Sequence, residues 1–212
     1  MTARLVYVMG PSGAGKDSLL AWLRTHLPDH FPLHWAQRTV SRPPATSAAP
    51  GTELHESVCA TSFAALREAG AFALHWQANG LGYGIRTAQL APLANGCWVL
   101  VNGSRAHLPQ ALAAFPALLP VHITASAAVL RQRLLARGRE TPGEVQARVQ
   151  RALDFALPPG LAHIEVCNDH RLEDAGQQLL AALGQVHGWP SAQAPARTCG
   201  GRLASPAPPS PA

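Results

Sequence analysis

Residues 10–18 read Gly10-Pro11-Ser12-Gly13-Ala14-Gly15-Lys16-Asp17-Ser18, and this stretch decides the fold. An apolar run at 5–9, typical of a buried strand, precedes it, and a helical pattern at 18–27 follows it. A strand, a glycine-rich turn and a helix in this order predict a P-loop, whose backbone N–H groups and helix N-terminus bind phosphate oxygens. Lys16, the only lysine of the chain, completes the spacing and predicts a contact with the β- and γ-phosphates of a nucleoside triphosphate.

The rest of the chain alternates apolar, strand-like runs with helical patterns. This alternation predicts an α/β fold, with a doubly wound parallel sheet of about five strands, helices on both faces and nucleotide at the carboxyl ends of the strands. We expect strands at 4–9, 33–40, 71–78, 98–102, 119–124 and 164–167. We expect helices at 16–27, 62–69, 106–114, 126–137, 141–157 and 172–186. Ser62 and Ser126 are the expected N-caps of two of these helices, and Thr141 and Glu144 have capping-box spacing.

One domain is expected over residues 1–187. Residues 41–86 are too irregular for a strand–helix–strand unit, so we interpret them as an inserted segment that binds a second substrate. Within this segment, 43–54 has the composition of a loop and Asn79-Gly80 predicts a turn between strands. From Gly188 onward Pro, Ala, Ser and Gly dominate, which predicts a disordered tail at 188–212.

The chain is basic, with a formal net charge of +5, but its arginines form no continuous run. A ligand with several phosphates explains them as well as nucleic acid does, so an RNA-binding protein remains an alternative that rests on charge alone. The four cysteines are far apart, and Cys97 and Cys167 fall in strands expected to be buried, which predicts reduced thiols in a cytoplasmic protein. No apolar run reaches 18 residues and no secretory leader is recognisable, so we expect neither a membrane nor export.

A group of arginines between 131 and 151 separates this chain from other P-loop proteins. They stand at positions 131, 133, 137, 139, 148 and 151. Helical spacing puts them on two helices joined by a bend, which predicts a lid that closes over transferring phosphates. We assign Arg137 and Arg148 to this lid function and Arg131 and Arg151 to solvent-exposed helix faces. The chain also lacks an Asn/Thr-Lys-x-Asp sequence for guanine, which disfavours a GTPase.

Several motifs together resemble those of the guanylate-kinase-like P-loop kinases. They are the 10–16 loop, the lid stretch at 133–140 with Arg148, and Val166-Cys167-Asn168-Asp169. The resemblance spans about residues 4–186. Within that group the chain is most similar to the ribose 1,5-bisphosphate phosphokinases of phosphonate catabolism. It shares with them the Gly-Lys-Asp-Ser of 15–18, the Trp-x-Ala-Asn-Gly-Leu-x-Tyr-Gly pattern of 76–84, and the 99–105 stretch continued by 107–109.

The resemblance implies an enzyme that uses ATP and Mg²⁺ to convert ribose 1,5-bisphosphate to 5-phospho-α-D-ribose 1-diphosphate. Residues 10–18 would bind the ATP phosphates and Asn168 would lie beside the adenine. Lys16, Arg137 and Arg148 would act on the moving phosphoryl group. The candidates for the acceptor are Arg38, Arg42, Tyr83 and Arg105, with Glu53 and His55 for ribose hydroxyls. We interpret Trp76 as a core residue.

Two departures from guanylate kinase matter chemically. An acidic residue that would read guanine is replaced by Leu74 and His75, so GMP is not the expected acceptor, although a nucleoside monophosphate kinase remains the alternative enzyme. The P-loop hydroxyl is replaced by Asp17, with Ser18 behind it, and the acid expected after the 98–101 strand is Asn102. Asp17 and Ser18 are therefore candidate Mg²⁺ ligands, with helix capping as the other role for Asp17. A non-catalytic interaction module of this fold is disfavoured because Lys16 is present.

Overall fold

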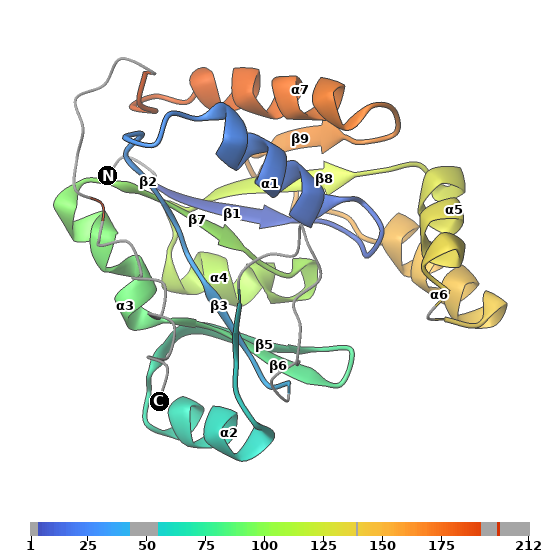
Figure 1. Ribbon diagram of the computed structural model, residues 1–212, viewed down its shortest axis with the longest axis horizontal. Coiled ribbons are helices and arrows are strands. Elements are labelled where there is room, and N and C mark those ends of the chain that lie inside the picture. The colour runs from blue at the N-terminus through green and yellow to red at the C-terminus, as the bar shows by residue number, and fades with distance from the viewer. Residues whose placement is uncertain (1–3, 43–54, 139, 192–198, 200–212) are drawn as a thin grey trace, which may run out of the picture.

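Figure 1 shows a computed structural model that describes residues 4–42, 55–138, 140–191 and 199. Its centre is a five-stranded sheet in the order β2-β7-β1-β8-β9, with every neighbouring pair parallel. The strands are β1 (Leu5–Met9), β2 (Leu33–Trp35), β7 (Trp98–Asn102), β8 (Leu119–Thr124) and β9 (Ile164–Cys167). The doubly wound parallel sheet predicted from the alternation of elements is confirmed.

Helices cover both faces of this sheet (Figure 1). They are α1 (Lys16–His26), α3 (Thr87–Leu90), α4 (Leu108–Ala114), α5 (Ala127–Arg137), α6 (Pro142–Leu153) and α7 (Leu172–Gly184), with short 3₁₀ turns at Ala91–Asn95 and Arg105–His107. Helices α1 and α7 lie on one face and α4 on the other, whereas α5 and α6 project beyond the carboxyl ends of β1 and β8. Helices α5 and α6 therefore lie near the carboxyl end of the sheet, where the P-loop also lies.

Strand β1 is buried along its whole length, which explains its position in the middle of the sheet. Side chains alternate across a strand, so its apolar residues supply both hydrophobic cores. Val6 and Val8 face the core beneath α1 and α7, whereas Tyr7 and Met9 face the core shared with α4 and the second sheet. A strand with polar residues on one face could not hold this place.

A second sheet lies below the first (Figure 1), with the strand order β4-β3-β6-β5. Its elements are β3 (Arg38–Val40), β4 (His55–Ser57), β5 (Phe72–Ala78) and β6 (Leu81–Arg86), with α2 (Ala60–Glu68). The β5–β6 hairpin turns at Asn79 (φ 50°) and Gly80 (φ 75°), as the Asn-Gly pair predicted. Cys59, not Ser62, caps α2: its sulfur accepts a hydrogen bond from the Ser62 N–H.

The predicted strand at 33–40 is wrong, because the structure divides it between the two sheets. Strand β2 ends at Trp35, and the Ala36 N–H still donates to Leu100 O in the parallel sheet at 2.9 Å. The Gln37 N–H donates instead to the side chain of Gln89, at 2.9 Å, and the chain then enters β3. Residues 43–54, expected to be a loop, lie outside the described residues.

A half-buried ion pair ties three strands of the second sheet together. Arg86 donates two hydrogen bonds to the Glu56 carboxylate, at 2.8 and 2.6 Å, and Thr39 Oγ1 donates a third at 2.7 Å. The bonds from Arg86 lower the pKa of Glu56 below its usual range against the opposing effect of burial. Since Thr39, Glu56 and Arg86 lie on β3, β4 and β6, this contact fixes the wall that carries Arg38 and Tyr83.

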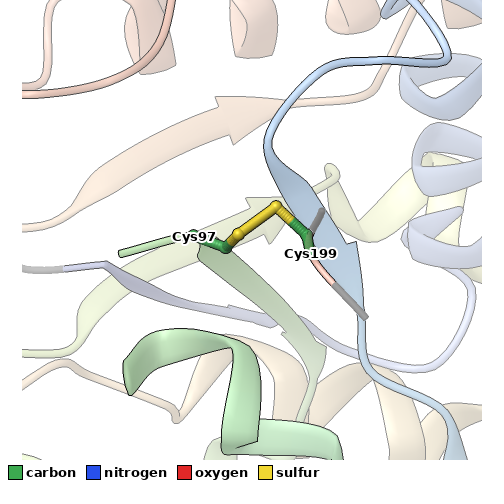
Figure 2. Close-up of a disulfide and its surroundings, with 2 residues drawn as sticks. All are labelled: Cys97 and Cys199. Carbon is green, nitrogen blue, oxygen red and sulfur yellow. A yellow bond between two sulfur atoms is a disulfide. The ribbon is translucent and has the colours of Figure 1, made fainter. Parts of the chain in front are cut away.

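The predicted reduced state of the buried cysteine is wrong for Cys97, which forms a disulfide with Cys199 (Figure 2). Cys167 is exposed at the end of β9 rather than buried.

The predicted start of the disordered tail at residue 188 is also too early. Gly188 O accepts a hydrogen bond from Trp98 Nε1 at 3.0 Å, and the Trp189 ring packs on Trp98. Residues 192–198 and 200–212 of the predicted tail lie outside the described residues. Among the helices described, none has the length and hydropathy to cross a bilayer.

Candidate active site

The P-loop leaves the carboxyl end of β1 and enters α1, as its sequence predicts. Gly10 lies so close to Ile123 of β8 that a side chain there would collide with the Ile123 carbonyl. Gly15 has φ 81°, in the left-handed region, and forms the N-cap of α1. Lys16 Nζ donates to the carbonyl of Gly10 at 2.9 Å, so its ammonium lies over the loop and faces the space where phosphates would bind.

Asn168, at the end of β9, supports this loop from behind. Its side chain is buried, and its Nδ2 donates to the carbonyl of Ala14 at 2.8 Å. A Cβ added at Gly15 would lie 2.5 Å from Asn168 Nδ2. The Asn168 amide can therefore take this place only because residue 15 has no side chain. Asn168 does not line the cleft described below, so the geometry favours support of the loop rather than contact with a base.

Asp17 and Asn102 meet beside the loop. Asn102 Nδ2, at the end of β7, donates to Asp17 Oδ1 at 2.8 Å. Gly15, which has no side chain, is the N-cap of α1, and Asp17 is the acidic residue of its first turn. The residues described contain no cluster of three or more His, Cys, Asp or Glu side chains for a metal. Mg²⁺ in kinases is held by one or two protein oxygens together with substrate phosphates, and Asp17 and Ser18, both on the cleft wall, fit that smaller requirement.

The two arginine-bearing helices form the expected pair. Helix α5 begins at its Ser126 cap, and α6 begins with the predicted capping box of Thr141 and Glu144. Arg148 of α6 donates to Ser12 Oγ of the P-loop at 3.1 Å. Its other terminal nitrogen pairs with Glu140 at 3.2 Å, in a contact that leaves 23% of Arg148 and 11% of Glu140 exposed. Sequence reasoning did not single out Glu140, whose only signal is its place in the bend.

The loop after β7 positions Arg105. Tyr7 lies beneath it, and its hydroxyl donates to Ser104 O at 3.0 Å and accepts from Ser104 N at 2.9 Å. Burial raises the pKa of Tyr7 to about 12, so the phenol stays protonated and keeps both bonds. Any side chain at Gly103 would collide with the Tyr7 ring. Tyr7 is therefore a supporting residue that sequence analysis missed, because a tyrosine in an apolar strand is indistinguishable from core.

The second sheet forms the opposite wall. The Arg38 guanidinium lies 5.6 Å from the centre of the Tyr83 ring. Trp76 stacks on the same Tyr83 ring: the two ring centres are 5.8 Å apart and the ring planes are inclined by 8°. Trp76 is both core, as expected, and part of the cleft wall. His55 also lines the cleft, whereas Glu53 lies outside the described residues.

These walls enclose a cleft of about 780 Å³ at the carboxyl edge of the parallel sheet. It brings together nearly all of the residues that the sequence singled out: Gly10–Gly13, Gly15–Ser18, Arg38, Arg42, Tyr83, Arg105, Arg137 and Arg148. Ala14 is buried and Asn168 lies behind the loop. Arg151, assigned from sequence to a solvent-exposed face, also lines the cleft, whereas Arg131 points to Gln146 on the exposed side of the helix pair.

His122 lies buried in β8 under this basic cleft. Burial lowers its pKa to about 4, and the charges of Arg105, His163 and Lys16 act in the same direction. Its Nδ1 is 3.9 Å from Glu165 Oε2, too far for a direct hydrogen bond, and its ring packs edge-on against Phe155. His122 is therefore neutral at physiological pH and adds no charge to the phosphate-binding region.

A P-loop at the carboxyl edge of a parallel sheet, faced by an arginine-bearing helix pair, defines a P-loop kinase fold. The solved structure of guanylate kinase from Anaplasma phagocytophilum shares this fold, with a TM-score of 0.58 over 93% of this chain and 88% of that one, at 15% identity. No protein-family model matches the chain.

Relatives define the family more narrowly. The chain is 46% identical over 180 residues to the ribose 1,5-bisphosphate phosphokinase PhnN of Burkholderia mallei, which covers 85% of this chain and 95% of that protein. It is 49% identical over 183 residues to the protein of the same name from Laribacter hongkongensis, over 86% of this chain and 43% of that longer protein. The chain belongs to the ribose 1,5-bisphosphate phosphokinase family.

Proposed function

We propose that the protein transfers the γ-phosphoryl group of ATP to ribose 1,5-bisphosphate, giving ADP and 5-phospho-α-D-ribose 1-diphosphate, as a step of phosphonate degradation. The observation that carries the proposal is the single cleft in which the P-loop faces arginines from the second sheet and from α6. Membership of the family named for this reaction supports the choice of acceptor. The partners required are two small phosphorylated molecules.

The reaction needs alignment and charge neutralisation more than proton transfer. An oxygen of the acceptor's 1-phosphate, already ionised at neutral pH, attacks the γ-phosphorus, and the bond to the β–γ bridging oxygen breaks to release ADP. No general base is required, so the neutral His122 is no obstacle. Lys16 and the loop N–H groups bind the donor, and Arg137 and Arg148 stabilise the charge on the moving phosphoryl group.

Mg²⁺ would bind at Asp17 and Ser18 together with the phosphates. When bound, the ion neutralises charge on the β- and γ-phosphates. The hydrogen bond from Asn102 orients the Asp17 carboxylate, which takes the place of the acid expected at the end of β7. On the acceptor side, Arg38 is held against Tyr83, and Arg42 and Arg105 supply further positive charge on the cleft wall.

The reaction is proposed for the cytoplasm. That compartment is reducing, so the disulfide between Cys97 and Cys199 is expected only in oxidised preparations.

The decisive experiment is a product assay on the purified chain with ATP and each of three acceptors: ribose 1,5-bisphosphate, GMP and AMP. We expect diphosphate formation on the sugar and no comparable turnover of the nucleotides. Lys16→Met should abolish this turnover while leaving the fold intact, because the ammonium is partly exposed and its hydrogen bonds to Gly10 and Pro11 reach carbonyls of the loop itself. Parental turnover in Lys16→Met, or preference for GMP, would contradict the proposal.

A further inference from the structure

The cleft carries a pair of arginines that no donor-binding role explains. Arg105 follows β7 and Arg151 lies in the last turn of α6, and both line the cleft. Arg105 is fixed in place: its Nη1 donates to Ala152 O at 3.3 Å, and its guanidinium lies 4.8 Å from the centre of the Phe155 ring. Arg105 therefore rests against the end of α6, at Ala152, the residue that follows Arg151.

These two cations repel each other in the absence of an anion. Both guanidinium groups lie on the wall of one cleft, where burial lowers the pKa of Arg105 and the charge of Arg151 lowers it further. Within the described ranges neither side chain forms an ion pair, and Asp154, which caps α6 and also lines the cleft, accepts a hydrogen bond from Gln150 at 2.8 Å. A dianion between Arg105 and Arg151 would relieve this repulsion and use donors that are already oriented.

The pair is distinct from the arginines of the second sheet. Arg38 lies on β3, with its guanidinium over the Tyr83 ring, whereas Arg105 rests against the end of α6. Figure 1 shows the second sheet below the main sheet and α6 at its side, so one cleft receives positive charge from two different elements. A molecule with a phosphate at each end fits this arrangement better than a monophosphate does.

We infer that Arg105 and Arg151 form a second phosphate subsite of the acceptor cleft, so that the enzyme selects sugar bisphosphates over sugar monophosphates. The inference rests on the proposed function. One acceptor phosphate contacts Arg105 and Arg151, and the other contacts Arg38, Arg42 and Tyr83. Arg151 thereby becomes a specificity-determining residue, although its sequence position suggested only a solvated helix face.

The test uses Arg151→Gln, because Arg151 is exposed and its replacement leaves the packing of Arg105 on Phe155 untouched. The matched control is Arg131→Gln, which removes the same charge from the exposed side of the helix pair. We expect Arg151→Gln to raise KM for ribose 1,5-bisphosphate about tenfold, as the loss of one charge-assisted hydrogen bond predicts, and to leave KM for ATP within about twofold. Arg131→Gln should match the parent, and Arg151→Lys should fall between.

Equilibrium binding separates the outcomes. The parent should bind ribose 1,5-bisphosphate more tightly than ribose 5-phosphate, and Arg151→Gln should lose most of that preference. An unchanged KM and preference in Arg151→Gln would overturn the subsite, as would a rise in KM for ATP in place of the acceptor, which would assign Arg151 to the donor. If the parent turns over ribose 1,5-bisphosphate in these same assays, the proposed function stands whatever Arg151→Gln does. If the parent neither binds nor uses it, both fall.

Discussion

Replacing Glu140 by glutamine should slow phosphoryl transfer, although Glu140 is not among the residues that line the cleft. Glu140 pairs with Arg148 at 3.2 Å, while Arg148 also reaches Ser12 of the P-loop at 3.1 Å. The carboxylate thus holds the Arg148 guanidinium beside the P-loop, in the orientation proposed for contact with the γ-phosphate. Glutamine keeps the shape of the side chain and removes the charge, so the change tests positioning rather than packing.

The expected size follows from the geometry. Opposite charges 3.2 Å apart interact by about 5 kcal/mol at an effective dielectric constant of 20. Desolvation of the two groups and the ordering of their side chains offset most of this, which leaves about 1–2 kcal/mol for a pair that is neither fully buried nor fully exposed. Because 1.4 kcal/mol corresponds to a factor of ten in rate, kcat should fall about tenfold in Glu140→Gln.

The assay is kcat at saturating ATP and ribose 1,5-bisphosphate, run as a double-mutant cycle with Arg148→Gln. Glu140→Gln should cost little in the Arg148→Gln background, since its effect passes through Arg148. Glu173→Gln is the control, because it breaks an exposed pair with Arg171, and thermal melts show whether each variant is folded. Parental kcat in Glu140→Gln, or additive losses in the cycle, would refute the reasoning.

Three further predictions follow from other contacts. Asp17→Ala should shift the magnesium titration of activity to higher concentrations, whereas an unchanged titration would remove Asp17 from the metal site. The pKa of His122 in the folded protein, about 4, lies below its ordinary value of 6.5. Between these two pH values the unfolded chain binds more protons than the folded protein does. The free energy of unfolding should therefore fall by about 2 kcal/mol from pH 7 to pH 5. Urea unfolding of His122→Gln should show less of this loss; equal loss would place its origin elsewhere. Reducing the Cys97–Cys199 disulfide, which spans 102 residues, should lower stability by about 4–5 kcal/mol in the chain-entropy account. Since Cys97 precedes the amino end of β7, away from the cleft, kcat should not change on reduction, and Cys199→Ser should melt like the reduced parent.

Local signals predicted much of this protein from sequence. The P-loop, the Asn79-Gly80 turn, the Ser126 cap and the capping box at Thr141 all appear where the residues put them, because each depends on contacts within about four positions. The order of elements also predicted the parallel sheet. The residues of the cleft followed from a resemblance to a kinase family, and the structure brings nearly all of them to one edge of that sheet.

Contacts between distant segments could not be inferred in this way. The strand expected at 33–40 divides because Gln37 bonds to Gln89, 52 positions away. Cys97 can form a disulfide because the chain brings Cys199, 102 residues later, next to it. Sequence spacing showed that Arg148 and Arg151 share a helix, but not that both would face a cleft.

The sequence by itself determined that this chain forms a strand–loop–helix unit of the P-loop type, because backbone geometry and a few glycines suffice for that. Only the tertiary structure decided that Asn168 supports the loop, that Tyr7 and Gly103 orient the loop before Arg105, and that Arg151 joins the cleft. The physical reason is that burial and charge proximity depend on which surfaces meet when the sheets and helices pack, and a linear pattern does not contain that information.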